Sequence, residues 1–136
     1  VTPDHWTEII EPVSKKLDGV KITSVDWKDV IKTKSQFDDK DVLLYLDPPY
    51  YNASKNIYNN EFTKQEHITL CNELKKTKFN FVLSYNDNPD IENMYNWANV
   101  EKVNWKYFMS EGRRQKGFEL LISNYKINQK ISEFKN

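Results

Sequence analysis

The chain has 136 residues, which is enough for one domain with a single sizeable core. Twenty Lys and Arg residues balance twenty Asp and Glu residues, so the overall charge excludes a general electrostatic attraction to nucleic acid. Any such binding would depend on a local patch or on a further part of the protein.

The sulfur and imidazole side chains are few. The single cysteine, Cys71, cannot form a disulfide within the chain, which favours a reducing compartment, and we expect the cytoplasm. With His5 and His67 as the only histidines, a structural zinc site has too few ligands, so we expect no metal. No apolar run is long enough to cross a membrane. The first residue is Val1 rather than Met, which indicates a processed product or a piece of a longer protein.

The first part of the chain is expected to form a helix, a strand and a short second helix. Thr2-Pro3-Asp4 is typical of a helix start, and Asp18-Gly19 of a helix end. Residues 20–25 alternate as a strand does, with Asp26 at the carboxyl end, and residues 28–33 suit a short helix. The apolar positions of the first helix recur at helical spacing and are Trp6, Ile9, Ile10, Val13 and Leu17.

The central feature is Asp47-Pro48-Pro49-Tyr50, called the platform below, which follows the apolar run of residues 42–46. Proline cannot continue a ladder of strand hydrogen bonds, so one interpretation is a buried strand that ends in a turn. The other is a corner of an active site, because ligands of open α/β sheets bind beyond the carboxyl ends of strands.

After the platform, residues 51–61 form a polar loop rich in Asn and Tyr, which we expect to be mobile until a ligand binds. Thr63 and Glu66 have the spacing of a capping box and predict a helix that ends near residues 76–77. Its buried face is assigned to Ile68, Leu70, Cys71 and Leu74, and His67 to its surface.

The remaining pattern predicts a strand, a short helix and a hairpin. Residues 79–85 suit a strand that ends in Asn86 and Asp87, and Asn88-Pro89 begins the short helix. Alternation around residues 103–107 and a more continuous apolar run at 118–125 indicate an antiparallel hairpin with a loop at 110–117. Alternating strands and helices predict a three-layer α/β sheet, with the structured part at residues 1–127 and a polar tail at 128–136.

The platform offers a particular set of contacts to a ligand. The carboxylate accepts hydrogen bonds, and the backbone around two prolines presents carbonyl acceptors with few competing N–H donors. The tyrosine ring supplies a flat face for stacking. A planar heterocycle with an exocyclic amino group, such as adenine, suits these contacts.

On these residues the sequence resembles a known family. Asp47-Pro48-Pro49-Tyr50 after an apolar strand is similar to the catalytic tetrapeptide of S-adenosylmethionine-dependent amino methyltransferases. The strand ending Leu83-Ser84-Tyr85-Asn86-Asp87 and the terminal run from Gly112 to Leu121 extend the likeness to DNA adenine methyltransferases of the Dam type. The tetrapeptide alone is less specific, since cytosine-N4, RNA and protein methyltransferases use close variants. The resemblance implies a Rossmann-like methyltransferase sheet, mostly parallel with a terminal antiparallel hairpin.

The resemblance also implies roles for residues of the platform. Asp47 and the Pro48 carbonyl would accept hydrogen bonds from the N6 amino group of an adenine flipped out of double-stranded DNA, with Pro49 shaping the turn and Tyr50 stacking on the base. The methyl group would pass directly from S-adenosylmethionine to N6 without a covalent enzyme intermediate. Asp26 would meet the cofactor, together with Asp47; the alternative for Asp26 is a helix N-cap.

Further residues are candidates for contacts with DNA. Tyr51 and Tyr58 would close over the flipped base, although exposed loop tyrosines are common. Arg113, Arg114 and Lys116 would bind phosphates, although a solvated hairpin tip explains them nearly as well. These roles imply association with the nucleoid.

Two parts that the family uses are absent from this sequence. Its members hold the cofactor with a glycine-rich turn, and the three glycines here, Gly19, Gly112 and Gly117, lack that spacing. The family's DNA-reading domain is also absent. We therefore expect the carboxyl-terminal half of a catalytic domain, inactive alone and dependent on an amino-terminal cofactor-binding segment. An RNA or protein amino-group methyltransferase and a non-catalytic interaction module completed by a partner chain remain alternatives, and a restriction-modification role remains open.

Overall fold

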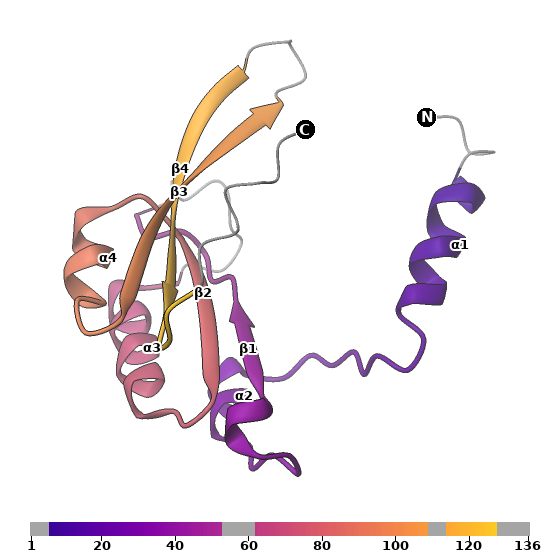
Figure 1. Cartoon of the computed structure of the whole chain (residues 1–136), viewed down its shortest axis with the longest axis horizontal. Helices are drawn as coiled ribbons and strands as arrows, with labels where there is room; N and C mark the ends of the chain where they lie inside the picture. The colour runs from indigo at the N-terminus through magenta and orange to yellow at the C-terminus, as the bar shows by residue number, and fades with distance from the viewer. Residues whose placement is uncertain (1–5, 53–61, 109–113, 128–136) are drawn as a thin grey trace.

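The computed structural model describes residues 6–52, 62–108 and 114–127. The described elements in chain order are helix α1 (Trp6–Lys16), helix α2 (Trp27–Lys32), the 3-10 helix η2 (Asp39–Asp41), strand β1 (Leu43–Leu46), helix α3 (Lys64–Lys76), strand β2 (Asn80–Asn86), helix α4 (Pro89–Met94), strand β3 (Asn99–Phe108) and strand β4 (Arg114–Ser123). Figure 1 shows their arrangement.

The strands form one sheet in the order β1-β2-β4-β3. β1 is parallel to β2, whereas β4 is antiparallel to both β2 and β3. The predicted hairpin is therefore confirmed, and its second strand inserts next to β2. Among the described strands the sheet is mixed rather than mostly parallel, because that hairpin supplies two of the three pairings.

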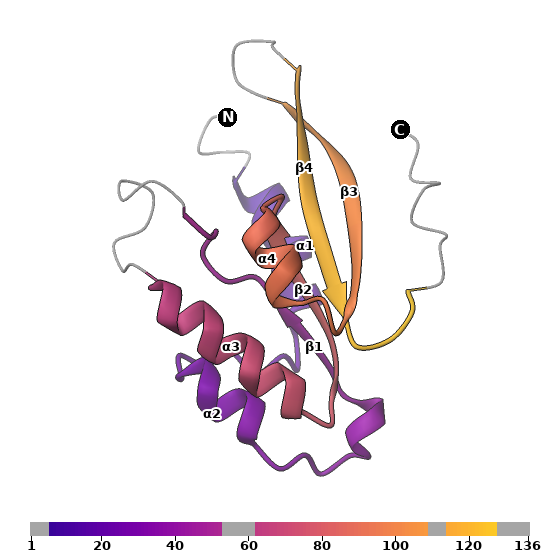
Figure 2. The ribbon, with the colours of Figure 1, turned by 90° about the vertical axis from the view of Figure 1, so that its left-hand side faces the viewer.

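The helices α2, α3 and α4 lie on one side of the sheet (Figure 2). β2 provides the centre of the core, since Phe81, Leu83 and Tyr85 alternate toward the helices and are fully buried. α3 covers them with Leu70, Cys71 and Leu74. The three-layer arrangement expected from the sequence is not present in the described residues, where the opposite face of the sheet has no helix packed on it.

The start of α3 is held by the predicted capping box. The Thr63 hydroxyl accepts a hydrogen bond from the Glu66 N–H at 3.2 Å, and the Glu66 carboxylate accepts one from the Thr63 N–H at 2.7 Å. These bonds keep the pKa of Glu66 below its usual value, chiefly through the Thr63 backbone. α3 therefore begins at a defined residue immediately after the segment that follows the platform.

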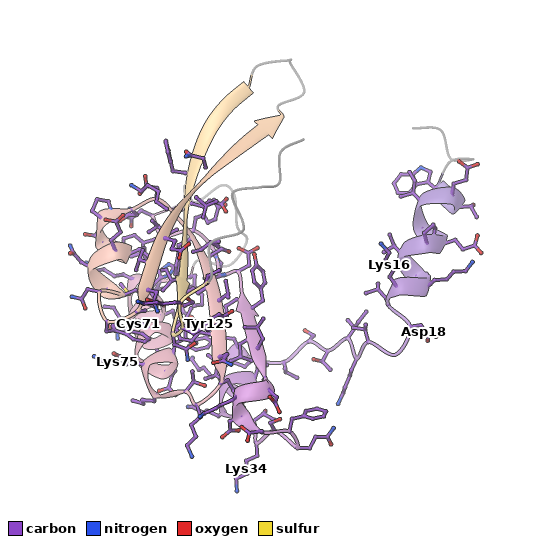
Figure 3. All side chains as sticks on the ribbon, in the orientation of Figure 1. Lys16, Asp18, Lys34, Cys71, Lys75 and Tyr125 are labelled. Atoms are coloured by element: carbon purple, nitrogen blue, oxygen red, sulfur yellow. The ribbon has the colours of Figure 1, made fainter. Side chains whose placement is uncertain are left out.

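α1 stands apart from the sheet, beyond its β1 edge (Figure 1). The side chains in Figure 3 show the same separation, with Lys16 and Asp18 far from the labelled residues of the sheet and helices. None of the residues of α1 is buried. Its apolar stripe, predicted correctly as helical, has no covering surface in the described structure.

The strand expected at residues 20–25 is wrong. This segment has no regular secondary structure, and Val20, Ile22 and Val25 are exposed. An alternating pattern becomes a strand only when a neighbouring strand satisfies its backbone groups, and the described residues provide none here.

The loop expected at residues 110–117 is shorter than predicted. β4 already begins at Arg114, and Arg114 and Lys116 pair with Phe108 and Lys106 of β3. The predicted tail at residues 128–136 lies outside the described residues. Among the helices described, none has both the length and the apolar character needed to cross a bilayer.

Candidate active site

The platform lies where two parallel strands end. β1 ends at Leu46, which pairs with Leu83 of β2, so Asp47 comes next to Ser84. The Ser84 hydroxyl donates a hydrogen bond to Asp47 Oδ1 at 3.0 Å. Ser84 is itself buried, with 5% of its surface exposed, so it is a fixed donor. One oxygen of the Asp47 carboxylate is thus held in place by the neighbouring strand.

The backbone after the platform is also tied to β2. The Tyr51 N–H donates to Asn86 Oδ1 at 3.0 Å, and the Asn86 side-chain amide donates to the Tyr51 carbonyl at 3.2 Å. The Asn86 side chain therefore bonds the chain as a neighbouring strand would. Asn52 follows with a φ of 56°, a left-handed conformation that asparagine adopts more readily than most residues.

The ring of Tyr50 is held from β4. Its hydroxyl donates a hydrogen bond to Glu119 Oε1 at 2.7 Å. Glu119 pairs with Asn86 in the antiparallel register of β2 and β4, so both residues lie at the same end of the sheet. Ser84 and Glu119 thus fix the acid and the aromatic ring, and Asn86 fixes the backbone that follows them.

His67 is buried, and its expected position on the surface of α3 is wrong. Only 2% of its surface is exposed. Its ring lies edge-on to Tyr51 with centroids 5.1 Å apart, and to Phe62 with centroids 4.7 Å apart. Its Nδ1 shares a hydrogen bond of 2.6 Å with the Tyr85 hydroxyl. His67 therefore occupies the core directly beneath the chain that leaves the platform.

Burial changes the titration of this pair. Desolvation lowers the pKa of His67, although the nearby Glu66 carboxylate and a hydrogen bond to the Phe62 backbone oppose it. Burial raises the pKa of Tyr85, so its hydroxyl stays protonated. The two side chains are neutral at physiological pH and joined by one hydrogen bond.

Tyr51, expected to close over a base, is part of this packing. Only 3% of its surface is exposed, and it belongs to the hydrophobic core. Tyr58 and Arg113 lie outside the described residues. Arg114 and Lys116 are on β4, at the end of the hairpin away from its connection to β2. The structure thus brings Asp47, Tyr50 and Tyr51 together.

A cavity of about 520 Å³ runs along the β1 edge and reaches the platform. Its wall includes Asp47, Pro48 and Pro49, and the rest of its lining comes from α2, β1 and the residues Thr23, Val25, Trp27, Phe62 and Leu70. Ligand pockets commonly measure roughly 300–1,000 Å³. The cavity therefore has the size of a small-molecule site and has a carboxylate at its wall.

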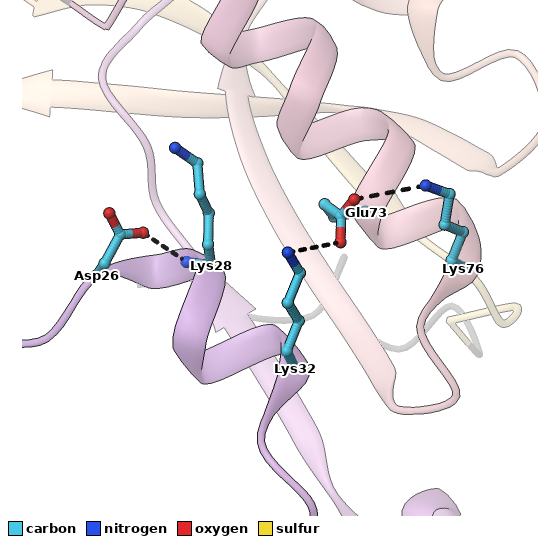
Figure 4. A network of polar contacts seen from close by, with 5 residues as sticks. All are labelled: Asp26, Lys28, Lys32, Glu73 and Lys76. Carbon is cyan, nitrogen blue, oxygen red and sulfur yellow. Dashed lines mark hydrogen bonds and ion pairs between the residues drawn. The ribbon is translucent and has the colours of Figure 1, made fainter.

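Asp26 caps α2. Its Oδ1 accepts a hydrogen bond from the Lys28 N–H at 2.8 Å, as Figure 4 shows. α2 is in turn tied to α3 by an ion pair of 3.7 Å between Lys32 and Glu73, and Lys76 adds a second contact to Glu73 at 3.5 Å. Asp26 is thus a helix cap, while its neighbours Val25 and Trp27 line the cavity.

Sequence reasoning missed the roles of four residues, namely Ser84, Asn86, Glu119 and His67. Ser84 and Asn86 could have been predicted to lie near the platform, because the carboxyl ends of adjacent parallel strands share one edge of a sheet. Glu119 is on an antiparallel strand whose place beside β2 is not readable from local pattern. For metal ions, no cluster of three or more His, Cys, Asp or Glu side chains occurs within the described residues.

Comparison with known families gives a match over most of the chain. Residues 4–109 match the model of the D12 class N6 adenine-specific DNA methyltransferases. A search of curated proteins found no match. The matched range contains the platform, its β2 anchors and His67. The chain belongs to the D12 class of N6 adenine-specific DNA methyltransferases.

Proposed function

We propose that this chain is the carboxyl-terminal, adenine-accepting part of a Dam-type DNA methyltransferase that uses S-adenosylmethionine. The observation that carries this proposal is the anchored platform, in which Ser84 holds Asp47 and Glu119 holds Tyr50 at one end of the sheet. The family match supports adenine N6 as the target in DNA. The position of the platform beyond a parallel strand supports its use as a ligand site.

Asp47 is proposed to hold the amino group of the substrate. A carboxylate has about four acceptor positions, so the bond from Ser84 leaves Asp47 able to accept a hydrogen bond from the N6 amino group. The Pro48 carbonyl would accept the other N6 hydrogen. Both acceptors would orient the nitrogen and stabilise the positive charge that develops as it gains a methyl group. One proton then leaves N6 for solvent.

Tyr50 is proposed to stack on the flipped adenine. Its hydroxyl donates a hydrogen bond to Glu119, which fixes the edge of the ring, and the flat tyrosine ring is the group proposed to stack on the base. Pro49 limits the backbone conformations between the acid and the ring. The platform thus presents acceptors and a stacking ring in one rigid arrangement.

The cavity beside β1 is proposed to contribute to cofactor binding. S-adenosylmethionine supplies an electrophilic methyl group on a sulfonium when bound. The cavity has a suitable volume, an aromatic wall at Trp27 and a carboxylate at Asp47, so the residues present fit part of such a ligand. Asp26 would contribute through the carboxylate oxygen that does not cap α2.

A second segment is proposed to complete this site. β1 is an edge strand, and its Leu43 and Tyr45 side chains are largely exposed. α1 stands beyond the same edge with an uncovered apolar stripe (Figure 1). An amino-terminal segment with a glycine-rich turn would cover both surfaces and supply the remaining cofactor contacts. We accordingly propose that the chain alone is inactive.

Contacts with double-stranded DNA are proposed for the basic residues of the hairpin. Arg113, Arg114 and Lys116 would bind phosphates, and Tyr58 would lie near the flipped base. Because Tyr51 is buried, its proposed contribution is to support the platform from below. An enzyme that modifies chromosomal DNA in this way would be found at the nucleoid.

The proposal is tested by substituting Asp47 in an active enzyme that contains this chain. Asp47→Ala should lower the rate of methyl transfer by at least about 10²–10³-fold, because a preorganised acceptor is removed. Asp90→Ala is the matched control, since Asp90 is exposed in the first turn of α4, and it should leave transfer unchanged. Normal transfer by Asp47→Ala enzyme that remains folded would contradict the proposed role.

The proposal that the chain alone is inactive is tested separately. The isolated chain is mixed with labelled S-adenosylmethionine and an adenine-containing duplex, and the label in DNA is counted. We expect none above background, and transfer by the chain alone would refute the claim that a second segment is needed.

A further inference from the structure

The segment that leaves the platform is fixed from the core by one buried pair of side chains, His67 and Tyr85. We propose that these two are positioning residues for the platform and not merely parts of the core. Their catalytic consequence rests on the function proposed above, whereas their effect on the platform's structure does not.

The first observation is what the His67 ring contacts. It packs edge-on against Tyr51 at 5.1 Å and against Phe62 at 4.7 Å between centroids. Tyr51 directly follows the platform, and Phe62 directly precedes the cap of α3. One ring therefore holds the chain on both sides of residues 53–61, so a change in its orientation is transmitted to the residue next to Tyr50.

The second observation is how the ring is itself held. Its Nδ1 and the Tyr85 hydroxyl are 2.6 Å apart, a short hydrogen bond between two buried groups. Packing alone would permit rotation of the ring about its bond to Cβ, whereas a directional bond selects one orientation. Tyr85, together with the hydrogen bond between His67 and the Phe62 backbone, thus fixes the plane in which the ring meets Tyr51 and Phe62.

The third observation is the place of Tyr85 in β2. It lies between Ser84 and Asn86, which bond Asp47 and Tyr51 directly. Successive side chains of a strand point to opposite faces, so Ser84 and Asn86 hold the platform from the outer face while Tyr85 acts through His67 from the helix-covered face. Three successive residues of one strand therefore clamp the platform from both faces of the sheet.

A histidine that only filled space would be poorly suited to this position. Burying an imidazole and a phenol hydroxyl costs free energy unless each is hydrogen-bonded, and an apolar pair of similar size avoids that cost. The hydrogen bond of the polar pair orients the His67 ring, which an apolar pair of the same volume would not do. When the bond is removed, we therefore expect faster amide exchange at Tyr51 and no change in the rest of the core.

The structural test is amide hydrogen exchange on the 136-residue chain. Tyr85→Phe removes one oxygen and His67→Phe keeps an aromatic ring, so both are expected to fold. Each should speed exchange of the Tyr51 N–H, which is bonded to Asn86, by about tenfold relative to the Leu83 N–H in the centre of β2. Adding Tyr85→Phe to His67→Phe should have little further effect, because His67→Phe already removes the bond that the Tyr85 hydroxyl makes.

Leu74→Ala provides the matched control. Leu74 is buried on the same helix two turns from His67, and its truncation should speed exchange throughout the core without selecting Tyr51. If Tyr85→Phe and His67→Phe give that same uniform pattern, or no change at all, the positioning role is overturned.

The catalytic test uses an active enzyme that contains this chain. Because the platform holds the reacting amino group and not the DNA backbone, Tyr85→Phe should lower kcat about tenfold and leave KM for DNA nearly unchanged. His67→Asn, whose amide can approximate the position of Nδ1, should recover part of kcat relative to His67→Ala. Selective exchange at Tyr51 with unaltered kcat would refute only the catalytic consequence, and failure of Asp47→Ala to reduce transfer would instead refute the proposed function.

Discussion

Helices α1 and α3 both carry an apolar stripe at helical spacing, but only α3 buries it. The side chains Leu70, Cys71 and Leu74 of α3 lie in the core, whereas none of the residues of α1 is buried. The difference arises from neighbours, because α3 faces β2, whereas α1 lies beyond the β1 edge, where no described element covers it. An amphipathic pattern thus predicts a helix without showing what covers it, and α1 marks a surface suited to a further segment.

The difference between α1 and α3 is tested most strongly by truncating Leu74 of α3 and Leu17, which directly follows α1. Leu74, of which 1% is exposed, should cost about 2–5 kcal/mol of unfolding free energy when changed to Ala, because a cavity remains. Leu17, at the end of the α1 stripe and 46% exposed, should cost no more than about 0.5 kcal/mol. Urea denaturation of the isolated chain measures both values.

Leu17→Ala also tests whether a further segment covers the apolar stripe of α1. In an active enzyme that contains this chain, Leu17→Ala should become clearly destabilising if α1 is covered by the completing segment. Equal and small effects of Leu17→Ala in both proteins would show that α1 remains uncovered, and would contradict the proposed arrangement at the β1 edge.

Much of the fold was predictable because its signals are local. The capping box at Thr63 and Glu66 located the start of α3, and Asn88-Pro89 located α4. Residues 20–25 show the limit, since their alternation is real but a strand depends on a neighbour elsewhere in the chain. The insertion of β4 next to β2 is likewise nonlocal, which explains why the sheet is less parallel than predicted.

In the candidate site, too, local signals were predictable and nonlocal contacts were not. Asp47 and Tyr50 were predicted from their own motif, whereas the role of Glu119 follows only from the pairing of β2 with β4. His67 is a different case. The buried positions of α3 are 67, 70, 71 and 74, which is a regular helical spacing. The spacing alone therefore predicts a buried His67, whereas the polar character of histidine led to its assignment to the surface.

The burial of His67 predicts a pH dependence for the α3 side of the molecule. Because the pKa of His67 is lower in the folded chain than in the unfolded chain, the unfolded state binds more protons between the two values. Stability should therefore fall as the pH drops below about 6.5, by at most about 1.4 kcal/mol per pH unit for this one group. Denaturation of the isolated chain between pH 7.5 and 5.5 measures the slope.

Glu66, whose pKa its capping bonds lower from 4.5, loses its contribution only below that value and adds almost nothing to the slope between pH 7.5 and 5.5. His67→Phe isolates the histidine contribution, since it removes only that group. The difference in slope between the original chain and His67→Phe should be positive, and identical slopes would contradict the protonation of a buried His67 as the cause.

The smallest change in unfolding free energy is expected from the surface ion pairs, and here α1 and α3 should differ least. Lys15 and Glu11 form a pair of 3.3 Å within α1, while Lys32 of α2 and Glu73 of α3 are 3.7 Å apart and join two elements (Figure 4). Exposed pairs contribute roughly 0–1 kcal/mol. Lys15→Met should change stability by about 0.3 kcal/mol or less, and Lys32→Met by slightly more, because Glu73 is only 22% exposed. Repeating both measurements in 1 M salt should remove the difference, since high salt screens charges that water still reaches. A difference that survives in salt would mean that the aliphatic part of Lys32, rather than its charge, holds α2 against α3.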